Sequence, residues 1–121
     1  MDQAAGFEAY REIISRINPD TDAACPVQSA LELFSNKWTL RVLYELTKND
    51  SLRFGQLRRQ IPGITNTMLS TTLKSLERKD LLIRTQYNEI PPHTEYRLSE
   101  KGKGLYIVFL SIMDWSQRYG A

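Results

Sequence analysis

The sequence has few of the residues that carry disulfide, metal or nucleophilic chemistry. Its 121 residues include one cysteine and one histidine, so no disulfide framework can form within one chain. A Cys–His nucleophile pair would lack a visible orienting group, and neither a metal-ligand cluster nor a phosphate-binding loop is present in the sequence. We therefore expect no enzymatic activity, no cofactor and no metal.

Long hydrophobic runs and targeting patterns are absent as well. The longest apolar stretch, from Leu105 to Trp115, is interrupted by Ser111 and Asp114 and falls far short of the ~20 residues of a membrane span. The first residues, MDQAAGFEAYREII, lack the basic segment and apolar core of a signal peptide. Hydrophobic residues make up 41% of the chain and charged residues 25%, which excludes a disordered or fibrous chain. These features predict a small cytoplasmic protein without a membrane partner.

The formal net charge of +2 hides an uneven distribution. Residues 1–36 hold six acidic and two basic residues, whereas residues 37–84 hold ten basic and four acidic ones. A basic middle segment in a nearly neutral protein is a candidate contact surface for a polyanion. On charge alone, a solvated face that binds nothing is an equally good interpretation.

Apolar spacing and turn residues predict a mostly helical N-terminal two-thirds. A helix that carries Phe7, Tyr10 and Ile14 is followed by an acidic linker, and a second helix starts at Cys25-Pro26. Later elements are expected as a helix near 37–47, a short extended segment at 51–53, a helix at 54–61, a turn at Pro62-Gly63, and a helix from Thr65 to about Lys79.

The remainder of the chain predicts a hairpin and a final helix. Residues 82–87 and 94–98 alternate like strands around a loop at 88–93, and Ser99 caps a helix that runs to about Tyr119. Two helices joined by a tight glycine-containing turn and followed by a hairpin form a winged helix-turn-helix. The expected class is α+β, mostly α, divided into an N-terminal helix and linker (1–24), a winged-helix domain (25–105) and the rest of a C-terminal dimerisation helix (106–121).

The predicted helix after the turn has one polar face suited to DNA. Leu69, Leu73 and Leu76 form its apolar stripe, and amide, hydroxyl and basic groups occupy the other side. We expect contacts to DNA from Thr65, Asn66, Thr67, Ser70, Thr71, Lys74 and Arg78. Phosphate contacts are expected from Arg58 and Arg59, with Lys37 and Arg53 as weaker candidates and His93 as the potential cation of the wing loop. The alternative is an ordinary solvated helix face.

The final helix has apolar residues on two sides, which predicts that it packs against two different surfaces. One side packs on its own domain, and the cheapest partner for the other is the same helix of a second copy. The expected interface contains Phe7, Tyr10, Ile14, Leu105, Tyr106, Phe109, Leu110, Ile112 and Met113. In the alternative, the two terminal helices cover each other within one chain.

Several motifs together resemble those of one family of bacterial winged-helix regulators. The segments CPVQSALELFSNKWTLRVLYEL, RFGQLRRQIPGITNTMLSTTLKSLERKDLL and IPPHTEYRLSEKGKGL occur in the order typical of the HxlR-type branch, which is related to the MarR family. The resemblance covers about residues 25–105. It implies a homodimeric transcription factor that binds an inverted-repeat operator in double-stranded DNA. Two positions depart from the pattern, since His93 stands where a basic residue is frequent and Asn36 where Gly or Asp is frequent.

Cys25 is the one candidate for a redox-sensing residue in the sequence. A thiol at a helix N-terminus is favoured as the reactive thiolate. In some HxlR-type regulators the matching cysteine senses oxidants, quinones or aldehydes, so the resemblance implies an oxidant or small-molecule effector. In the alternative, Cys25 is a packing residue, as free cysteines often are.

Two other functions remain open from the sequence. A winged-helix module that binds protein rather than DNA would share the fold. An RNA-binding module is less consistent with the residues, because the basic segment lacks the stacking aromatics that such modules use.

Overall fold

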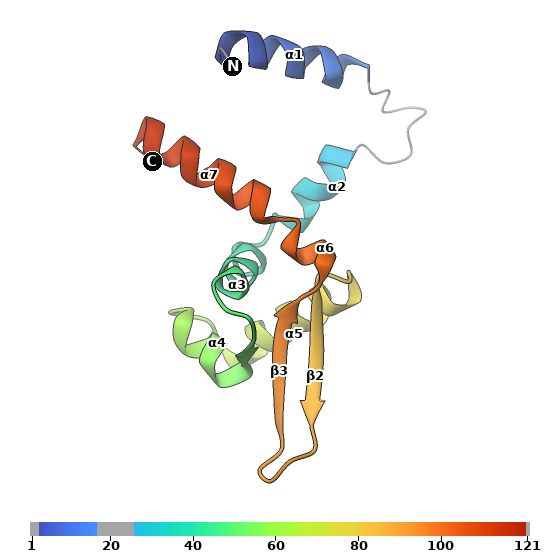
Figure 1. Cartoon of the computed structure of the whole chain (residues 1–121), viewed down its shortest axis with the longest axis vertical. Helices are drawn as coiled ribbons and strands as arrows, with labels where there is room; N and C mark the ends of the chain where they lie inside the picture. The colour runs from blue at the N-terminus through green and yellow to red at the C-terminus, as the bar shows by residue number, and fades with distance from the viewer. Residues whose placement is uncertain (1–2, 17–25, 121) are drawn as a thin grey trace. The chain divides into compact units, whose positions relative to one another are not determined.

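The computed structural model describes residues 3–16 and 26–120, which belong to two compact units, residues 1–35 and 36–121 (Figure 1). The first unit contains α1 (Gln3–Ser15) and α2 (Pro26–Leu33). The rings of Phe7 and Tyr10 lie 6.5 Å apart on α1. The start of α2 at Pro26 agrees with the predicted proline at the first helical position.

The second unit contains the remaining helices and a small sheet. Its elements in chain order are α3 (Lys37–Thr47), β1 (Leu52–Arg53), α4 (Phe54–Gln60), α5 (Asn66–Arg78), β2 (Leu82–Tyr87), β3 (His93–Leu98), α6 (Glu100–Lys103) and α7 (Tyr106–Tyr119). The sheet is antiparallel with the order β1-β3-β2, and the β2–β3 hairpin extends past α4 and α5 (Figure 1). This arrangement confirms the predicted winged helix-turn-helix.

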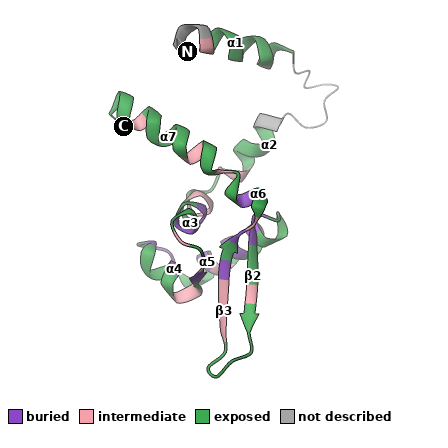
Figure 2. Cartoon of the chain, viewed as in Figure 1, coloured by how far each residue is buried: buried purple, intermediate pink, exposed green. Residues whose placement is uncertain are grey.

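The core of the second unit is built where α3, α4, α5 and the sheet meet. Its fully buried side chains include Val42 and Leu43 from α3, Leu57 from α4, and Leu69 and Leu76 from α5. Figure 2 shows buried residues on α3, on α5 and on the helix-proximal end of the hairpin, whereas α7 and the hairpin tip are largely exposed. Burial of these side chains fixes the orientation of α5, because one whole stripe of that helix is committed to the core.

The start of α3 shows how a local capping group sets an element. Asn36 is the N-cap residue, and its Oδ1 accepts a hydrogen bond from the backbone N–H of Trp38 at 2.8 Å. Asn36 therefore does more than interrupt the preceding helix, because its side chain satisfies an N–H group at the start of the next one.

The predicted continuous helix from Ser99 to Tyr119 is divided in the structure. Ser99 caps the single turn of α6 by accepting from the N–H of Gly102 at 3.0 Å, and Gly104 ends that turn. Gly102 lies so close to Leu81 that an added Cβ would collide with the Leu81 carbonyl oxygen, so the helix start is held against the β2 strand entry. The α7 helix then begins at Tyr106 and, at 14 residues, is the longest described helix. None of the helices in residues 3–16 and 26–120 is long and apolar enough to cross a membrane.

Candidate nucleic-acid interface

The α5 helix is oriented by its cap and its buried stripe. Thr65 lies at the N-cap, where its Oγ1 accepts a hydrogen bond from the N–H of Met68 at 3.1 Å. Leu69, Leu73 and Leu76 are at most 2% exposed, as predicted from their spacing. Thr72 is also buried and donates its hydroxyl proton to the Met68 carbonyl at 2.8 Å. The Thr65 hydroxyl oxygen is thus engaged in the N-cap hydrogen bond of α5.

The opposite side of α5 forms a polar surface with a shallow hollow. Asn66, Thr67, Thr71, Lys74 and Arg78 are exposed, and Ser70 is half-buried. The hollow has a volume of about 430 Å³, and its lining consists of Phe54, Asn66, Thr67, Ser70, Thr71 and Lys74. Five of the seven residues predicted on this helix therefore share one concave surface, whereas Thr65 and Arg78 lie outside the lining.

The preceding helix and its turn are fixed to both α3 and α5. Gly63 in the turn has φ of +86°, a left-handed conformation that favours glycine. Arg58 on α4 donates from Nη1 to Oδ1 of Asn66 at 3.4 Å, which links α4 to the first residue of α5. On the other side, Arg41 of α3 donates from Nη2 to the Gln60 carbonyl at 3.1 Å, which holds the C-terminal end of α4. Two arginine side chains thus link α4 to α3 and to α5.

The basic residues of the second unit fall into two groups. Those that form ion pairs with carboxylates are Arg41, Lys48, Lys103 and Arg118. Within the described part of the chain, the exposed basic residues of α4 and α5 have no such partner: Arg58, Arg59, Lys74 and Arg78. Six other exposed basic residues of this unit also have no carboxylate partner among the residues that the structure describes, namely Lys37, Arg53, Lys79, Arg84, Arg97 and Lys101. The helix-turn-helix surface therefore carries four of the cations that no carboxylate neutralises, and none of its own basic residues is paired.

Lys37 and Arg53, the weaker basic candidates, lie apart from the hollow. Lys37 begins α3, and its Nζ lies 4.6 Å from the centre of the Trp38 ring. Arg53 is exposed in β1, where it pairs with Glu95 of β3 and its N–H donates to Oε1 of Gln56 at 2.8 Å. Neither residue lines the concave surface of α5.

The single histidine is packed at the base of the wing loop. The rings of Tyr87 and His93 stack with centroids 4.8 Å apart, and Nδ1 of His93 lies 3.8 Å from Oε2 of Glu89. The His93 side chain is only 16% exposed. A hydrogen bond to Glu95, together with the negative charge of that carboxylate, raises the pKa of Tyr87, so this phenol stays protonated at neutral pH. His93 therefore organises the hairpin end, and its predicted contact with DNA stays a prediction.

The register of the hairpin reveals a basic residue that the sequence reasoning missed. Arg84 pairs with Tyr96, and Leu82 pairs with Leu98, so Arg84 lies on the same face of the hairpin as the buried residues Leu82, Tyr96 and Leu98. Arg84 itself is exposed, since it lies farther along the hairpin than Leu82. The i, i+2 spacing from Leu82 was the available signal, because residues two apart on a strand share a face.

The predicted dimer residues of α7 are largely uncovered. No α7 residue is fully buried, and Tyr106, Leu110, Ile112 and Met113 are 49–59% exposed. Phe109 is half-buried, with its ring 5.9 Å from that of Tyr44. Leu105, at the N-cap of α7, is also half-buried. On α1, Phe7 and Tyr10 are 56% and 51% exposed, and Ile14 is half-buried.

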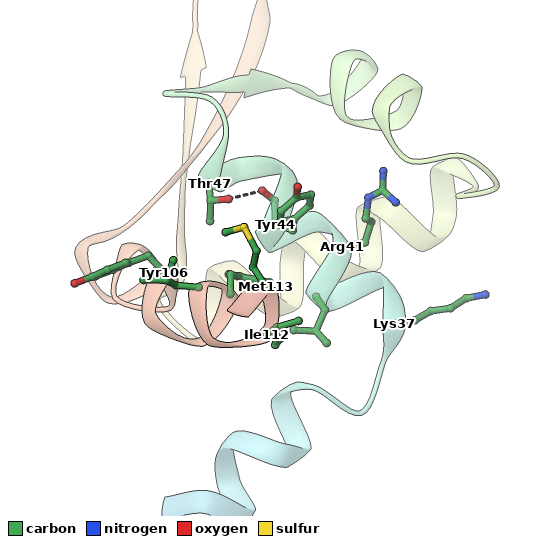
Figure 3. Close-up of a pocket in the computed structure, with 10 residues that line it drawn as sticks. Lys37, Arg41, Tyr44, Thr47, Tyr106, Ile112 and Met113 are labelled. Carbon is green, nitrogen blue, oxygen red and sulfur yellow. Dashed lines mark hydrogen bonds between the residues drawn. The ribbon is translucent and has the colours of Figure 1, made fainter. Parts of the chain in front are cut away.

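A groove of about 630 Å³ runs between α3 and α7 (Figure 3). Tyr44, Thr47, Ile112 and Met113 lie around its middle, and the Thr47 hydroxyl donates to the Tyr44 carbonyl at 2.6 Å. The side chain of Lys37 extends away from α7 in Figure 3, which leaves the groove mainly apolar.

Cys25, the predicted redox residue, lies outside the described residues, and α2 begins at the next position, Pro26.

Comparisons with known proteins agree with the fold and its motifs. The sequence model of the HxlR-like helix-turn-helix family matches residues 33–121. An uncharacterised HTH-type transcriptional regulator from Methanothermobacter thermautotrophicus is 39% identical over 102 residues, which cover 84% of this chain and 77% of that protein. These matches confirm the resemblance that the motifs indicated.

Two solved structures extend the comparison. A protein assigned to the MarR family of transcriptional regulators, from Porphyromonas gingivalis W83, superimposes with a TM-score of 0.73 at 35% identity, covering 82% of this chain and 96% of that one. The redox regulator HypR in its oxidised form superimposes with a TM-score of 0.70 at 33% identity, covering 78% of this chain and 96% of that one.

Proposed function

Because the chain belongs to the HxlR-like helix-turn-helix family of transcriptional regulators, we propose that it binds a specific inverted-repeat site in double-stranded DNA as a homodimer. The observation that carries this proposal is the surface of α4 and α5. Unpaired cations and exposed amide and hydroxyl groups lie together there, next to a concave polar hollow. A duplex groove requires both of these features, since cations neutralise phosphates and amide or hydroxyl groups reach base edges.

The residues divide into phosphate-binding and base-reading groups. Arg58 and Arg59 lie on the helix before α5 and Arg84 lies on the strand after it; all three are exposed, and we assign them to phosphates. Asn66, Thr67 and Thr71 line the hollow and are assigned to base edges. Lys74 is long enough to reach either a guanine or a phosphate. Arg58 already contacts Asn66, so a phosphate on Arg58 would also position the amide for a base.

The salt dependence of duplex binding tests the electrostatic part of the proposal. Each phosphate contact releases condensed counterions, so log affinity should fall linearly with log salt by about 0.9 per contact. The test uses a duplex that the full chain protects in a footprinting experiment. Fluorescence anisotropy on this duplex should show log affinity falling steeply with log salt concentration. Arg59→Ala should reduce that slope by about one and weaken all sequences equally. Binding that is insensitive to salt would contradict the phosphate contacts, and a chain that binds no duplex even at low salt would favour the protein-binding module.

Base reading is tested separately by sequence preference. Thr67→Ala should relax the preference at one base pair per half-site, by the roughly 1–3 kcal/mol that one base contact contributes, while the salt slope stays unchanged. Ser75→Ala is the control, because it removes one hydroxyl from α5 itself at a half-buried position outside the hollow. Equal sequence preferences of Thr67→Ala and the wild-type protein would remove Thr67 from the base-reading group.

The homodimer is proposed from the uncovered apolar surface of α7. Its large side chains are about half exposed, and the neighbouring groove is mainly apolar, so a second copy gains by burying both. Two-fold pairing also presents two α5 helices, which fits an inverted repeat with half-site centres one helical turn apart, about 34–36 Å.

A charge placed on α7 tests this pairing. Leu110→Glu should convert the dimer to a monomer and weaken operator binding at least tenfold, because one half-site is then lost in each binding event. Gln117→Glu adds the same charge at an exposed polar position of the same helix and should remain dimeric. Analytical ultracentrifugation over a range of concentrations measures both. A wild-type protein that stays monomeric throughout would refute the homodimer.

We further propose that Cys25 makes DNA binding responsive to oxidants, on the strength of the similarity to the redox regulator HypR. A peroxide would oxidise one thiolate to a sulfenic acid, and the thiolate of a second subunit would displace hydroxide to form a disulfide across the dimer. Peroxide should then change the operator affinity of the wild-type protein and leave Cys25→Ser unaffected. A response that persists in Cys25→Ser would eliminate this role.

A further inference from the structure

One aromatic residue stands among polar groups on the proposed DNA-binding surface. Phe54 is the first residue of α4, and it lines the α5 hollow together with Asn66, Thr67, Ser70, Thr71 and Lys74. The other five lining residues are polar or basic. Phe54 is half-buried, so part of it packs on the protein and part contributes an apolar wall to the hollow.

The core of the protein does not bury Phe54 completely. The side chain of α4 that enters the core is Leu57, which is fully buried three residues later. Phe54 is less deeply buried than Leu57, and the accessible part of the residue borders the hollow. A specific apolar group of a ligand is therefore the feature that would complement it.

Among the base pairs of a duplex, thymine offers such a group at its major-groove edge. Its C5-methyl group projects into the groove next to O4, which is a hydrogen-bond acceptor. Thr67 and Thr71 line the same hollow, and a threonine hydroxyl can donate to an acceptor of this kind. A wall made of one aromatic ring and two hydroxyls thus matches a methyl group beside a carbonyl oxygen.

We propose that Phe54 is a specificity-determining residue that recognises the 5-methyl group of one thymine in each half-site. This inference rests on the proposed function, because it requires α5 to lie in a major groove. It extends the base-reading surface beyond α5 to the first residue of α4.

Deoxyuridine provides a direct test, because it lacks only the 5-methyl group and keeps every hydrogen-bonding atom of thymine. A duplex selected by the full chain from a random pool is prepared with each thymine replaced in turn by deoxyuridine. Replacement at one thymine per half-site should weaken binding of the wild-type protein about fourfold, the contribution of one buried methyl-sized group. Thymines outside the protected region serve as the control and should show no change.

Protein variants then assign the effect to the ring. Phe54→Ala should bind the thymine and deoxyuridine duplexes equally, and Phe54→Leu, which keeps an apolar side chain, should retain part of the difference. Circular dichroism and the salt slope of binding check that both variants remain folded and keep their phosphate contacts. Should Phe54→Ala be unfolded, Phe54→Leu and the wild-type deoxyuridine scan still decide the question.

The outcomes separate this inference from the function on which it rests. Specific binding that no deoxyuridine replacement weakens would overturn the methyl contact and leave DNA binding intact. A methyl dependence that Phe54→Ala and Phe54→Leu retain in full would move the contact to another residue and overturn the role of Phe54. A chain that selects no sequence from the pool would overturn the proposed function itself, and this inference with it.

Discussion

The ion pair between Arg41 and the buried carboxylate of Glu45 leads to a prediction about which of these two residues contributes more to the stability of the fold. Glu45 is 1% exposed, and its Oε1 accepts from Nε of Arg41 at 3.0 Å. Its Oε2 lies 3.1 Å from Nζ of Lys48, close enough for an ion pair but not aligned for a hydrogen bond. The side chains of Arg41 and Lys48 are 45% and 49% exposed, so the cations reach water and the anion does not.

Removing Arg41 should therefore destabilise the protein more than removing Glu45. Breaking a fully buried pair by deleting one partner costs roughly 3–5 kcal/mol, because the other charge is left uncompensated. Lys48 still compensates Glu45 in part, so we expect about 2 kcal/mol for Arg41→Met. Glu45→Met leaves two cations that are already half solvated and should cost about 1 kcal/mol or less. The double variant Arg41→Met/Glu45→Met should recover the part of the loss that comes from the unpaired buried charge, and should keep only the loss of the Arg41–Gln60 hydrogen bond, about 1 kcal/mol.

Urea unfolding followed by circular dichroism, at one fixed protein concentration, measures these free energies. Arg118→Met is the matched control, since Arg118 and Asp114 form an i, i+4 pair with both side chains more than 60% exposed. That control should change stability by no more than about 0.5 kcal/mol. The reasoning is refuted if Glu45→Met is the more damaging single variant, or if the double variant is as unstable as Arg41→Met.

Two further predictions concern the local geometry that supports the site. Gly102→Ala should destabilise the protein by about 1–3 kcal/mol, because the new Cβ meets the Leu81 carbonyl oxygen. Gly55→Ala is the control and should be neutral or slightly stabilising, because its Cβ would make only ordinary contact. Thermal unfolding compares the two variants, and equal melting temperatures would contradict the close approach of Gly102 to Leu81. Thr65→Ala should lower the free energy of unfolding by about 1 kcal/mol, because the α5 cap is lost. Thr67→Ala, at an exposed position, should change it by no more than about 0.5 kcal/mol. Equal stability of the two variants would show that the cap contributes nothing.

The sequence was sufficient to predict the elements with strong local signals. The spacing of Leu69, Leu73 and Leu76 predicted the buried stripe of α5, and Thr65 marked its start. Both are local features, since a cap and an amphipathic stripe depend on residues within a few turns of one another. The hairpin was predicted for the same reason, although β3 begins one residue earlier than expected, at His93.

Features that depend on contacts distant in sequence were missed. The close approach of Gly102 to Leu81 brings together two residues far apart in the sequence, and neither segment alone predicts it. Burial of Glu45 depends on the packing of α3 in the core, and a glutamate in an amphipathic helix is ordinarily exposed. The place of Phe54 in the α5 hollow depends on the angle between α4 and α5, which the sequence of neither helix specifies. The missed features are therefore tertiary, and two of them lie at the candidate site or support it.

The α3 helix connects the two surfaces that the proposed function requires. Through Arg41 it holds the C-terminal end of α4 and thereby the start of α5, and through Tyr44 it forms a wall of the groove beside α7. One helix therefore contacts both surfaces within a subunit. In a dimer paired through α7, the contacts of α3 with α4 and α7 would contribute to the separation of the two α5 helices, and with it to the spacing of the half-sites. We expect a variant that lacks the Arg41–Gln60 hydrogen bond to discriminate less between operators of different half-site spacing, while its affinity for a single half-site is unchanged. Fluorescence anisotropy on duplexes of different half-site spacing measures both affinities.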